Sequence, residues 1–284
     1  MKRVLITGKN SYVGNSFTDW VKDDPNIEVY KISLRNDKWK EYDFSTYDVV
    51  LHVAGIAHQK ETKENEHLYY QVNRDVTIEI AKKAKKDGVP HFVFLSSMSV
   101  YGVETGVINE KTPLKPKTNY GKSKLEAEEA ISDLASSSFN LSILRPPMIY
   151  GANCKGNYPK LAKLAVKTPI FPAVENKRSM IFIDNLSEFI KRLIKYDEVG
   201  LFFPQNVDFV KTSEMVKIIA ETHGKKLILT KFLNPFMKLF KIHTVNKVFG
   251  DLVYDKSLTA SIKDYNVKDF RTSIKLTENV ESKL

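Results

Sequence analysis

A tyrosine and a lysine four residues apart are the side chains of this sequence best suited to chemistry. Residues 120–124 read YGKSK and open a stretch with helical spacing, so Tyr120 and Lys124 are expected on one face of a helix. A phenol titrates at about 10 and is a poor base at neutral pH, but a fixed ammonium and the positive ring of an oxidised nicotinamide favour its phenolate form. We therefore predict that Tyr120 exchanges a proton with a carbinol or carbonyl oxygen while hydride moves between that carbon and a nicotinamide ring.

Ser97 is the third candidate for the same site. It follows an apolar run at residues 91–95 that predicts a strand, so it leaves that strand at the edge of a sheet. There its hydroxyl is placed to hydrogen-bond the same substrate oxygen as Tyr120. A tyrosine four residues before a lysine would also match any lysine-rich helix. Its order and spacing with Ser97 and with a glycine loop about 110 residues upstream make the combination specific.

The glycine loop follows the first apolar run, residues 2–7. Residues 7–14 read TGKNSYVG and lead into helical spacing. Glycines here permit a tight turn and close packing of the helix on the sheet, and the amides at the helix N-terminus face a pyrophosphate. A serine stands at the usual middle glycine, and two turn glycines without further function are the alternative reading. The predicted cofactor-binding residues of the loop are Gly8, Asn10, Ser11, Tyr12, Val13 and Gly14.

The end of the second predicted strand selects the cofactor. An acidic residue at this place normally accepts hydrogen bonds from the ribose 2′-hydroxyl of NAD. Here no acid occurs until Asp37, whereas Ser33 and Arg35 suit a 2′-phosphate. We predict that NADP(H) is favoured over NAD(H), with NAD(H) as the alternative if Arg35 is an ordinary surface charge.

Strands and helices alternate along the first part of the chain. This alternation predicts an α/β fold with a doubly wound parallel sheet, which binds ligands at the carboxyl ends of its strands. The predicted strands lie at residues 2–7, 26–33, 47–53, 91–95 and 139–144, and the predicted helices at residues 12–22, 67–86 and 119–135.

Two segments are harder to place. Residues 34–46 are too few for a helix and a strand, so we expect a degenerate edge strand there. After Gly151, prolines interrupt the pattern. Residues 180–183 and the helix after Asp184 are interpreted as a return to the main sheet.

The composition narrows the class of protein. The chain has 284 residues, enough for one large or two small domains. Cys154 is the single cysteine, so no intrachain disulfide forms and a reducing compartment is expected. No apolar run approaches about 18 residues, and the start of the chain lacks the apolar core of a signal peptide. We predict a cytoplasmic protein with no membrane span and no metal site.

The net charge of +10 is unevenly distributed. Between Glu221 and Asp251 the sequence holds lysines interleaved with apolar residues and no acid. We interpret residues 225–247 as a helix with a solvated lysine face. The alternatives are a lid over a charged substrate and peripheral contact with an anionic membrane surface. No nucleic-acid partner is predicted, because no binding motif accompanies the charge.

These motifs together resemble the extended short-chain dehydrogenase/reductase family, in its nucleotide-sugar epimerase/dehydratase branch. The resemblance covers nearly the whole chain and is strongest over residues 1–190. It implies a Rossmann NAD(P)-binding domain in residues 1–150, with residues 180–197 returning to it, and a smaller domain for the nucleotide sugar in residues 151–284. The matching pieces are TGKNSYVG at 7–14, LHVAG at 51–55, VN at 72–73, SSMSVYG at 96–102, YGKSK at 120–124 and LRPPMIYG at 144–151.

The resemblance also implies roles for individual residues. Ser97, Tyr120 and Lys124 would be catalytic. The tyrosine and the lysine would also contact the cofactor. Many members carry asparagine against the substrate where this chain has Met148. The further implied contacts are Ala54, Gly55 and Pro147 for the cofactor, with Asn73 near them, and His58, Ser99, Asn157 and Arg178 for the substrate.

The implied activity is oxidoreduction at C4 of a nucleotide-diphosphate sugar for bacterial surface polysaccharides. Arg35 and the missing acid favour NADPH-dependent reduction of a UDP-4-keto-6-deoxy-hexosamine, which we rank first. A UDP-sugar 4-epimerase with tightly held NAD is the alternative. A dehydratase is disfavoured because Met98 and Ser99 stand where an acidic pair is usual. A non-catalytic NAD(P)-sensing protein is the alternative of another class, although the intact Tyr120 and Lys124 oppose it. A homodimer is expected, since family members often pair.

Overall fold

Six parallel strands form the central sheet of the computed structural model, which describes residues 1–57, 59–234, 248–259 and 262–278. Their apolar residues, such as Val4, Leu5 and Ile6, are fully buried, as expected for strands covered on both faces. The predicted α/β fold with a doubly wound parallel sheet is confirmed. In sheet order the strands are β10 (Gly200–Phe202), β6 (Asn140–Leu144), β4 (His91–Leu95), β3 (Val49–His52), β1 (Lys2–Thr7) and β2 (Ile27–Ile32).

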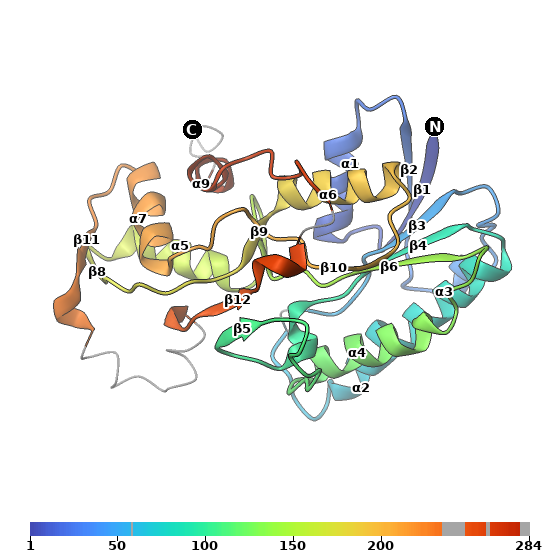
Figure 1. Ribbon diagram of the computed structural model, residues 1–284, viewed down its shortest axis with the longest axis horizontal. Coiled ribbons are helices and arrows are strands. Elements are labelled where there is room, and N and C mark those ends of the chain that lie inside the picture. Colours follow the sequence, from blue (N-terminus) through green and yellow to red (C-terminus); the bar gives the residue numbers. More distant parts are fainter. Residues whose placement is uncertain (58, 235–247, 260–261, 279–284) are drawn as a thin grey trace.

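Helices cover both faces of this sheet (Figure 1). On one face α1 (Tyr12–Val21) packs against α6 (Ile183–Lys195). On the other face lie α3 (Val76–Lys86) and α4 (Asn119–Ser132), whose apolar residues share a core with Phe92 and Phe94 of β4. The short α2 (Glu66–Tyr70) runs through a π-helical turn, Gln71–Asp75, into α3.

The expected edge strand in residues 34–46 is wrong. The segment forms a 3₁₀ turn, Asp37–Lys40, and β2 is the edge of the sheet. The chain must cross here from β2 to β3, on the far side of β1. Trp39 and Phe44 anchor this crossing by burying their rings in the core beneath α3.

The expected return of residues 180–183 to the main sheet is also wrong in part. Strand β9 (Met180–Phe182) pairs instead with β7 (Met148–Tyr150) in a separate sheet. Helix α6 does pack on the main sheet, because its apolar residues share a core with those of β1 and β3. The strand that joins the sheet beside β6 is β10. The runs at β9 and β10 are each three residues long, so their pairing is decided by long-range packing.

The remaining elements extend from the middle of the molecule to its left-hand end (Figure 1). Helices α5 (Asn157–Lys167), α7 (Thr212–Thr222) and α9 (Phe270–Glu278) pack together. Two small parallel sheets join β8 (Ile170–Pro172) to β11 (Ile228–Thr230) and β5 (Gly106–Ile108) to β12 (Leu252–Tyr254).

The basic stretch at residues 225–247 begins with β11 and a 3₁₀ turn, Lys231–Leu233, where a helix was expected. Its residues 235–247 lie outside the described residues, as does His58. In the part of the chain that the structure describes, no helix is long and apolar enough to cross a membrane.

Candidate functional site

The glycine loop lies directly against the turn that follows β3. Gly8 has a φ of +108°, and a Cβ there would approach the backbone Cα and N of Ala54 to 3.0 Å, so a side chain is excluded. The hydroxyl of Ser11 caps α1 by accepting a hydrogen bond of 3.1 Å from the amide of Gly14. A Cβ on Gly14 would lie 2.9 Å from Ile6, which explains the close approach of α1 to the sheet.

Tyr12 and Val13 turn their side chains into the protein, so only their backbone is available to a phosphate. Val13 is buried in the core. The hydroxyl of Tyr12 is buried without a hydrogen-bond partner among the described residues, and burial raises the pKa of this phenol. The hydroxyl reaches the end of β7, where a Cβ on Gly151 would lie 2.6 Å from it.

A pocket of about 850 Å³ opens at the carboxyl ends of β1, β2 and β3. We call it the loop pocket. Helix N-terminal amides, two glycines and a wall of small residues suit the diphosphate and adenosine of a dinucleotide. The pocket brings together six predicted cofactor-binding residues, Gly8, Asn10, Ser11, Arg35, Ala54 and Gly55.

The wall of the loop pocket after β2 is basic. Arg35 is exposed there, and its amide donates a hydrogen bond of 3.3 Å to the hydroxyl of Ser33. Asp37 is the first acidic residue after β2 along the chain, and it forms an ion pair of 3.2 Å with Lys40. A carboxylate held by a lysine is a poorer acceptor for a ribose hydroxyl.

The start of α4 fixes Tyr120 through hydrogen bonds to its backbone. The hydroxyl of Thr118 accepts a bond of 3.1 Å from the amide of Gly121. The carboxylate of Glu61 accepts bonds of 3.0 and 3.2 Å from the amides of Asn119 and Tyr120. Glu61 was not predicted from the sequence, because this cap comes from a loop 59 residues before Tyr120 and leaves no local signal.

Lys124 lies one helical turn further, buried against the end of β4. Its Nζ donates a hydrogen bond of 2.9 Å to the carbonyl of Leu95 and lies 4.6 Å from the ring centroid of Phe94. A Cβ on Gly55 would lie 3.4 Å from this Nζ, so Lys124 adjoins the loop pocket. Burial lowers the pKa of Lys124 to about 8, an effect that Glu128 opposes.

Ser97 and Tyr120 come together as the sequence predicts. Burial raises the pKa of the Tyr120 phenol, and a hydrogen bond with Ser97 lowers it in part. The expectation that Lys124 makes this phenol acidic is therefore not met in the protein alone, because burial outweighs the neighbouring groups. Ser97 also accepts a hydrogen bond of 3.1 Å from the amide of Ser99, which places Ser99 beside the same site.

Lys124→Met is expected to stabilise the dinucleotide-free protein at pH 7 while it removes activity. The folded-state pKa of Lys124, about 8, lies below its ordinary value of 10.5, so the unfolded state binds the proton more tightly. The buried ammonium therefore lowers the free energy of unfolding. This loss of stability is fully present below pH 8 and disappears as the pH rises from 8 to 10.5. A shift of this size corresponds to about 3 kcal/mol, from which the lost hydrogen bond to Leu95 subtracts about 1 kcal/mol.

Urea unfolding at neutral and alkaline pH measures this effect. The advantage of Lys124→Met at neutral pH should shrink at about pH 10, whereas Lys122→Met, at an exposed site of the same helix, should show no such trend. Equal or lower stability of Lys124→Met at pH 7 contradicts a destabilising buried ammonium.

A buried polar chain supports the turn that carries Ala54 and Gly55. His52 bonds Thr7 at 2.6 Å through Nδ1 and Thr77 at 2.9 Å through Nε2. The hydroxyl of Thr77 donates to the carbonyl of Asn73, so it accepts from Nε2–H, and Nδ1 accepts from Thr7. Burial lowers the pKa of His52 to about 3, so this histidine is neutral.

Asn73 connects the hydrogen bonds around His52 to helix α4. Its side chain accepts a hydrogen bond of 2.7 Å from the amide of Ile56 and donates one of 3.1 Å to the carbonyl of the same residue. It also donates to the hydroxyl of Ser123, which in turn donates to the carbonyl of Tyr120. The loop pocket and the start of α4 are thus held in one hydrogen-bonded unit.

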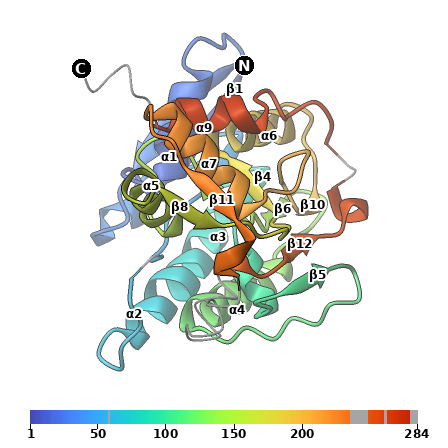
Figure 2. The ribbon, with the colours of Figure 1, turned by 90° about the vertical axis from the view of Figure 1, so that its left-hand side faces the viewer.

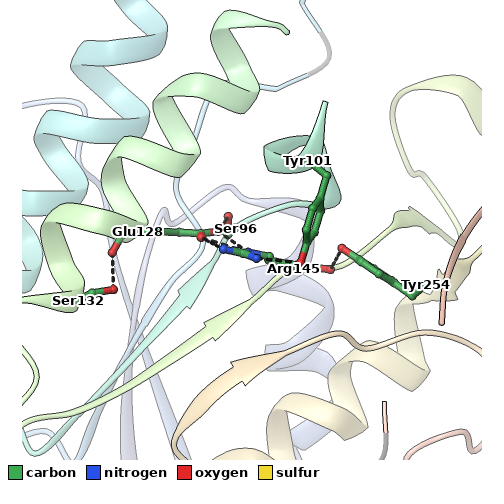
Figure 3. Close-up of polar contacts among 6 residues, drawn as sticks. All are labelled: Ser96, Tyr101, Glu128, Ser132, Arg145 and Tyr254. Carbon is green, nitrogen blue, oxygen red and sulfur yellow. Dashed lines mark hydrogen bonds and ion pairs between the residues drawn. The ribbon is translucent and has the colours of Figure 1, made fainter. Parts of the chain in front are cut away.

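A buried ion pair joins Arg145 to Glu128 (Figure 3). Arg145, at the end of β6, holds the carboxylate of Glu128 with hydrogen bonds of 2.5 to 3.1 Å. Ser96 donates to the same carboxylate, and Arg145 donates to the hydroxyl of Tyr101 at 2.9 Å. Because Glu128 lies four residues after Lys124 on α4, its charge partly offsets the desolvation of that lysine.

The other predicted ligand contacts lie outside the loop pocket. Pro147 is buried immediately before β7. Asn157 is exposed at the first position of α5, and the guanidinium of Arg178 donates a hydrogen bond of 2.9 Å to the carbonyl of Gly250. Among the described residues, no group of three His, Cys, Asp or Glu side chains is arranged to hold a metal ion.

Comparison with known sequences identifies the family of this chain. The family model for the NAD dependent epimerase/dehydratase family matches residues 4–201. The chain is 33% identical to a Vibrio cholerae protein named UDP-glucose 4-epimerase, over 91% of this chain and 88% of that protein. It is 28% identical to an Escherichia coli O157:H7 protein named N-acetyl-alpha-D-glucosaminyl-diphospho-ditrans,octacis-undecaprenol 4-epimerase, over 79% of this chain and 73% of that protein.

Solved structures share the fold at low sequence identity. The UDP-glucuronic acid 4-epimerase of Bacillus cereus superposes with a TM-score of 0.75 at 17% identity, covering 99% of both chains. A dTDP-4-dehydrorhamnose reductase of Clostridium acetobutylicum superposes with a TM-score of 0.74 at 17% identity, also over 99% of both. With the family model spanning most of the chain, the protein belongs to the NAD dependent epimerase/dehydratase family and is an NAD(P)-dependent enzyme.

Proposed function

We propose that this enzyme inverts C4 of a hexose or hexosamine carried on a diphosphate. Two observations carry the proposal. Tyr120 is hydrogen-bonded to Ser97 and lies one helical turn before Lys124, which adjoins the loop pocket at Gly55. The chain also aligns over 91% of its length with a protein named UDP-glucose 4-epimerase. Both relatives described above are named as 4-epimerases. This weighs against the reduction that Arg35 led us to rank first.

The side chains have distinct roles in this proposal. Bound NAD(P) supplies the acceptor and donor of the hydride. Tyr120 takes the proton of the C4 hydroxyl as the C4–H bond loses its hydride, which leaves a ketone, and it returns the proton when hydride is added to the opposite face. Ser97 holds the C4 oxygen, and Lys124, fixed by the carbonyl of Leu95, contributes positive charge that favours the phenolate.

The region after Gly151 is proposed to bind the sugar diphosphate. Arg178 and Asn157 belong to this region, and a guanidinium suits paired phosphate oxygens. Helices α5 and α7 and strands β8 and β11 of this region lie at the end of the molecule away from the central sheet (Figure 1). His58 stays a proposed substrate contact.

Reduction of a 4-keto sugar by NADPH is the second candidate. The basic wall at Ser33 and Arg35 favours it, because a 2′-phosphate gains charge-assisted hydrogen bonds there. A reductase must exchange its cofactor at each turnover, whereas an epimerase recovers the cofactor unchanged. The two activities therefore differ in whether the purified enzyme retains a dinucleotide.

Mass spectrometry of the denatured, purified enzyme is the test that separates the candidates. We expect retained dinucleotide and interconversion of UDP-N-acetylglucosamine and UDP-N-acetylgalactosamine, or of their undecaprenyl-diphosphate counterparts, without added cofactor. An empty enzyme that oxidises NADPH with a UDP-4-keto-6-deoxy-hexosamine supports reduction. Binding of dinucleotide without turnover of any of these sugars contradicts both and supports a sensing role.

Arg35→Ala extends the same experiment to cofactor choice. Loss of a charge-assisted contact of about 1.5–3 kcal/mol should weaken NADP(H) binding by about 10- to 100-fold and leave NAD(H) binding nearly unchanged. Calorimetric titration of both cofactors measures this, with Lys38→Ala as the control at an exposed site outside the loop pocket. Tighter binding of NAD(H) than of NADP(H) to the unmodified protein defeats the proposed preference.

A further inference from the structure

An exposed apolar pair marks one end of the molecule. In the parallel ladder of β8 and β11, Ile170 and Ile228 are register partners, so their side chains share a face of this small sheet. Their exposed fractions are 45% and 64%, whereas Phe171, the next residue on β8, is buried on the opposite face. Phe232, just beyond β11, is 77% exposed. We call this surface the β8–β11 tip.

Positive charge predominates around the tip, where Glu175 is within electrostatic reach of Lys231 and is paired with Lys211. Residues 157–172 and 222–234 contain six lysines and no aspartate or glutamate, so they account for most of the net charge of +10. Within the described residues none of the six takes part in an ion pair. All six are exposed: Lys160, Lys163, Lys167, Lys225, Lys226 and Lys231.

The tip lies apart from the dinucleotide site. Strands β8 and β11 occupy the left-hand extremity in Figure 1, and Figure 2 looks onto that end, with α5 and α7 beside the two strands. The loop pocket is lined only by residues between Gly8 and Glu79. A partner on the tip therefore leaves the loop pocket open.

We propose that the β8–β11 tip docks on an anionic lipid bilayer. Exposed aliphatic and aromatic side chains enter the interface, and surrounding lysines contact lipid phosphates while their stems remain in the apolar boundary. A second copy of the chain fits less well, because a two-fold pair would place the same lysines opposite one another. The inference does not rest on the proposed C4 chemistry.

Sedimentation with vesicles tests the tip directly. The full chain should bind vesicles of phosphatidylcholine containing phosphatidylglycerol, should not bind phosphatidylcholine alone, and should be released by salt. Each lysine near an anionic surface is worth about fivefold in partitioning, so Lys225→Gln/Lys226→Gln/Lys231→Gln should bind about 100-fold more weakly. The matched control, Lys38→Gln/Lys82→Gln/Lys86→Gln, removes the same charge from exposed sites elsewhere and should keep most of the binding.

A second variant tests the apolar part. Ile170→Ser/Ile228→Ser keeps every charge and should also weaken vesicle binding, while its thermal unfolding and its turnover of a water-soluble UDP-sugar stay as in the wild type. The proposal is overturned if the wild-type protein does not bind anionic vesicles, or if the tip variants bind them as well as the lysine control variant does. It is also overturned if the wild-type protein binds a DNA duplex and does not bind vesicles. Vesicle binding by a protein without epimerase or reductase activity keeps this inference and removes only the proposed function.

Discussion

Tyr120→Phe is expected to lower kcat by about 10²- to 10⁴-fold while dinucleotide binding is retained. The change removes one oxygen, and with it the group that exchanges a proton with the C4 oxygen, a contribution of this order for a positioned acid–base side chain. Binding should persist because the loop pocket is lined by residues before α4, and Tyr120 is not among them. Single-turnover measurement of hydride transfer, alongside calorimetric titration of the cofactor, separates chemistry from binding.

The pH profile sharpens this test. Burial raises the pKa of Tyr120 in the protein alone, so the activity of the wild type should rise with pH through the neutral range as the phenolate fraction grows. The residual activity of Tyr120→Phe should not show this rise with pH. Tyr196→Phe, which removes the same oxygen at an exposed site, is the control and should match the wild type. Full activity in Tyr120→Phe refutes the assigned role.

Breaking the ion pair of Glu128 and Arg145 is expected to produce the largest loss of stability. Removing one partner of a buried, hydrogen-bonded pair leaves an uncompensated charge and typically destabilises by about 3–5 kcal/mol. Glu128→Leu strands the guanidinium of Arg145, which reaches Glu128 at 2.5 Å and Tyr101 at 2.9 Å (Figure 3). Urea unfolding of the dinucleotide-free protein gives the change in the free energy of unfolding.

Helix α4 itself supplies the control for this prediction. Glu126 pairs with Arg74 at 2.8 Å, but both side chains are about a third or more exposed, so Glu126→Leu should change stability by no more than about 1 kcal/mol. The double variant Glu128→Leu/Arg145→Met removes both charges and should be less unstable than the sum of the two single variants. Additive losses, or a loss at Glu128 as small as that at Glu126, contradict a buried pair.

The sequence was sufficient for five of the six strands of the central sheet and for the residues that face each other within one element. Buried strands such as β1 and β4 are continuous apolar runs, and four-residue spacing on a helix fixes the relation of Tyr120 to Lys124. Short elements were harder. Strands β9 and β10 have three residues each, and the sheet that each joins depends on packing partners far away in sequence.

The electrostatics of the site could not be predicted from spacing. Proximity of an ammonium suggests an acidic phenol. Lys124 is buried and Tyr120 is half-buried, however, and desolvation shifts the pKa of each group so that its neutral form is favoured. Glu61 was missed for a related reason. A carboxylate in a loop is recognised as a helix cap only when the fold brings it to the amides of Asn119 and Tyr120.

The hydroxyl of Tyr254 donates a hydrogen bond of 2.8 Å to the backbone carbonyl of Arg145, and the strand that carries it, β12, pairs with β5. The surroundings of Arg145 are therefore completed by a segment synthesised more than 100 residues later. During translation, a nascent chain that has released only its first 150 residues leaves the carbonyl of Arg145 without this phenol donor and leaves β5 without its neighbour. The packing around Arg145 is then completed only when the ribosome has delivered nearly the entire polypeptide.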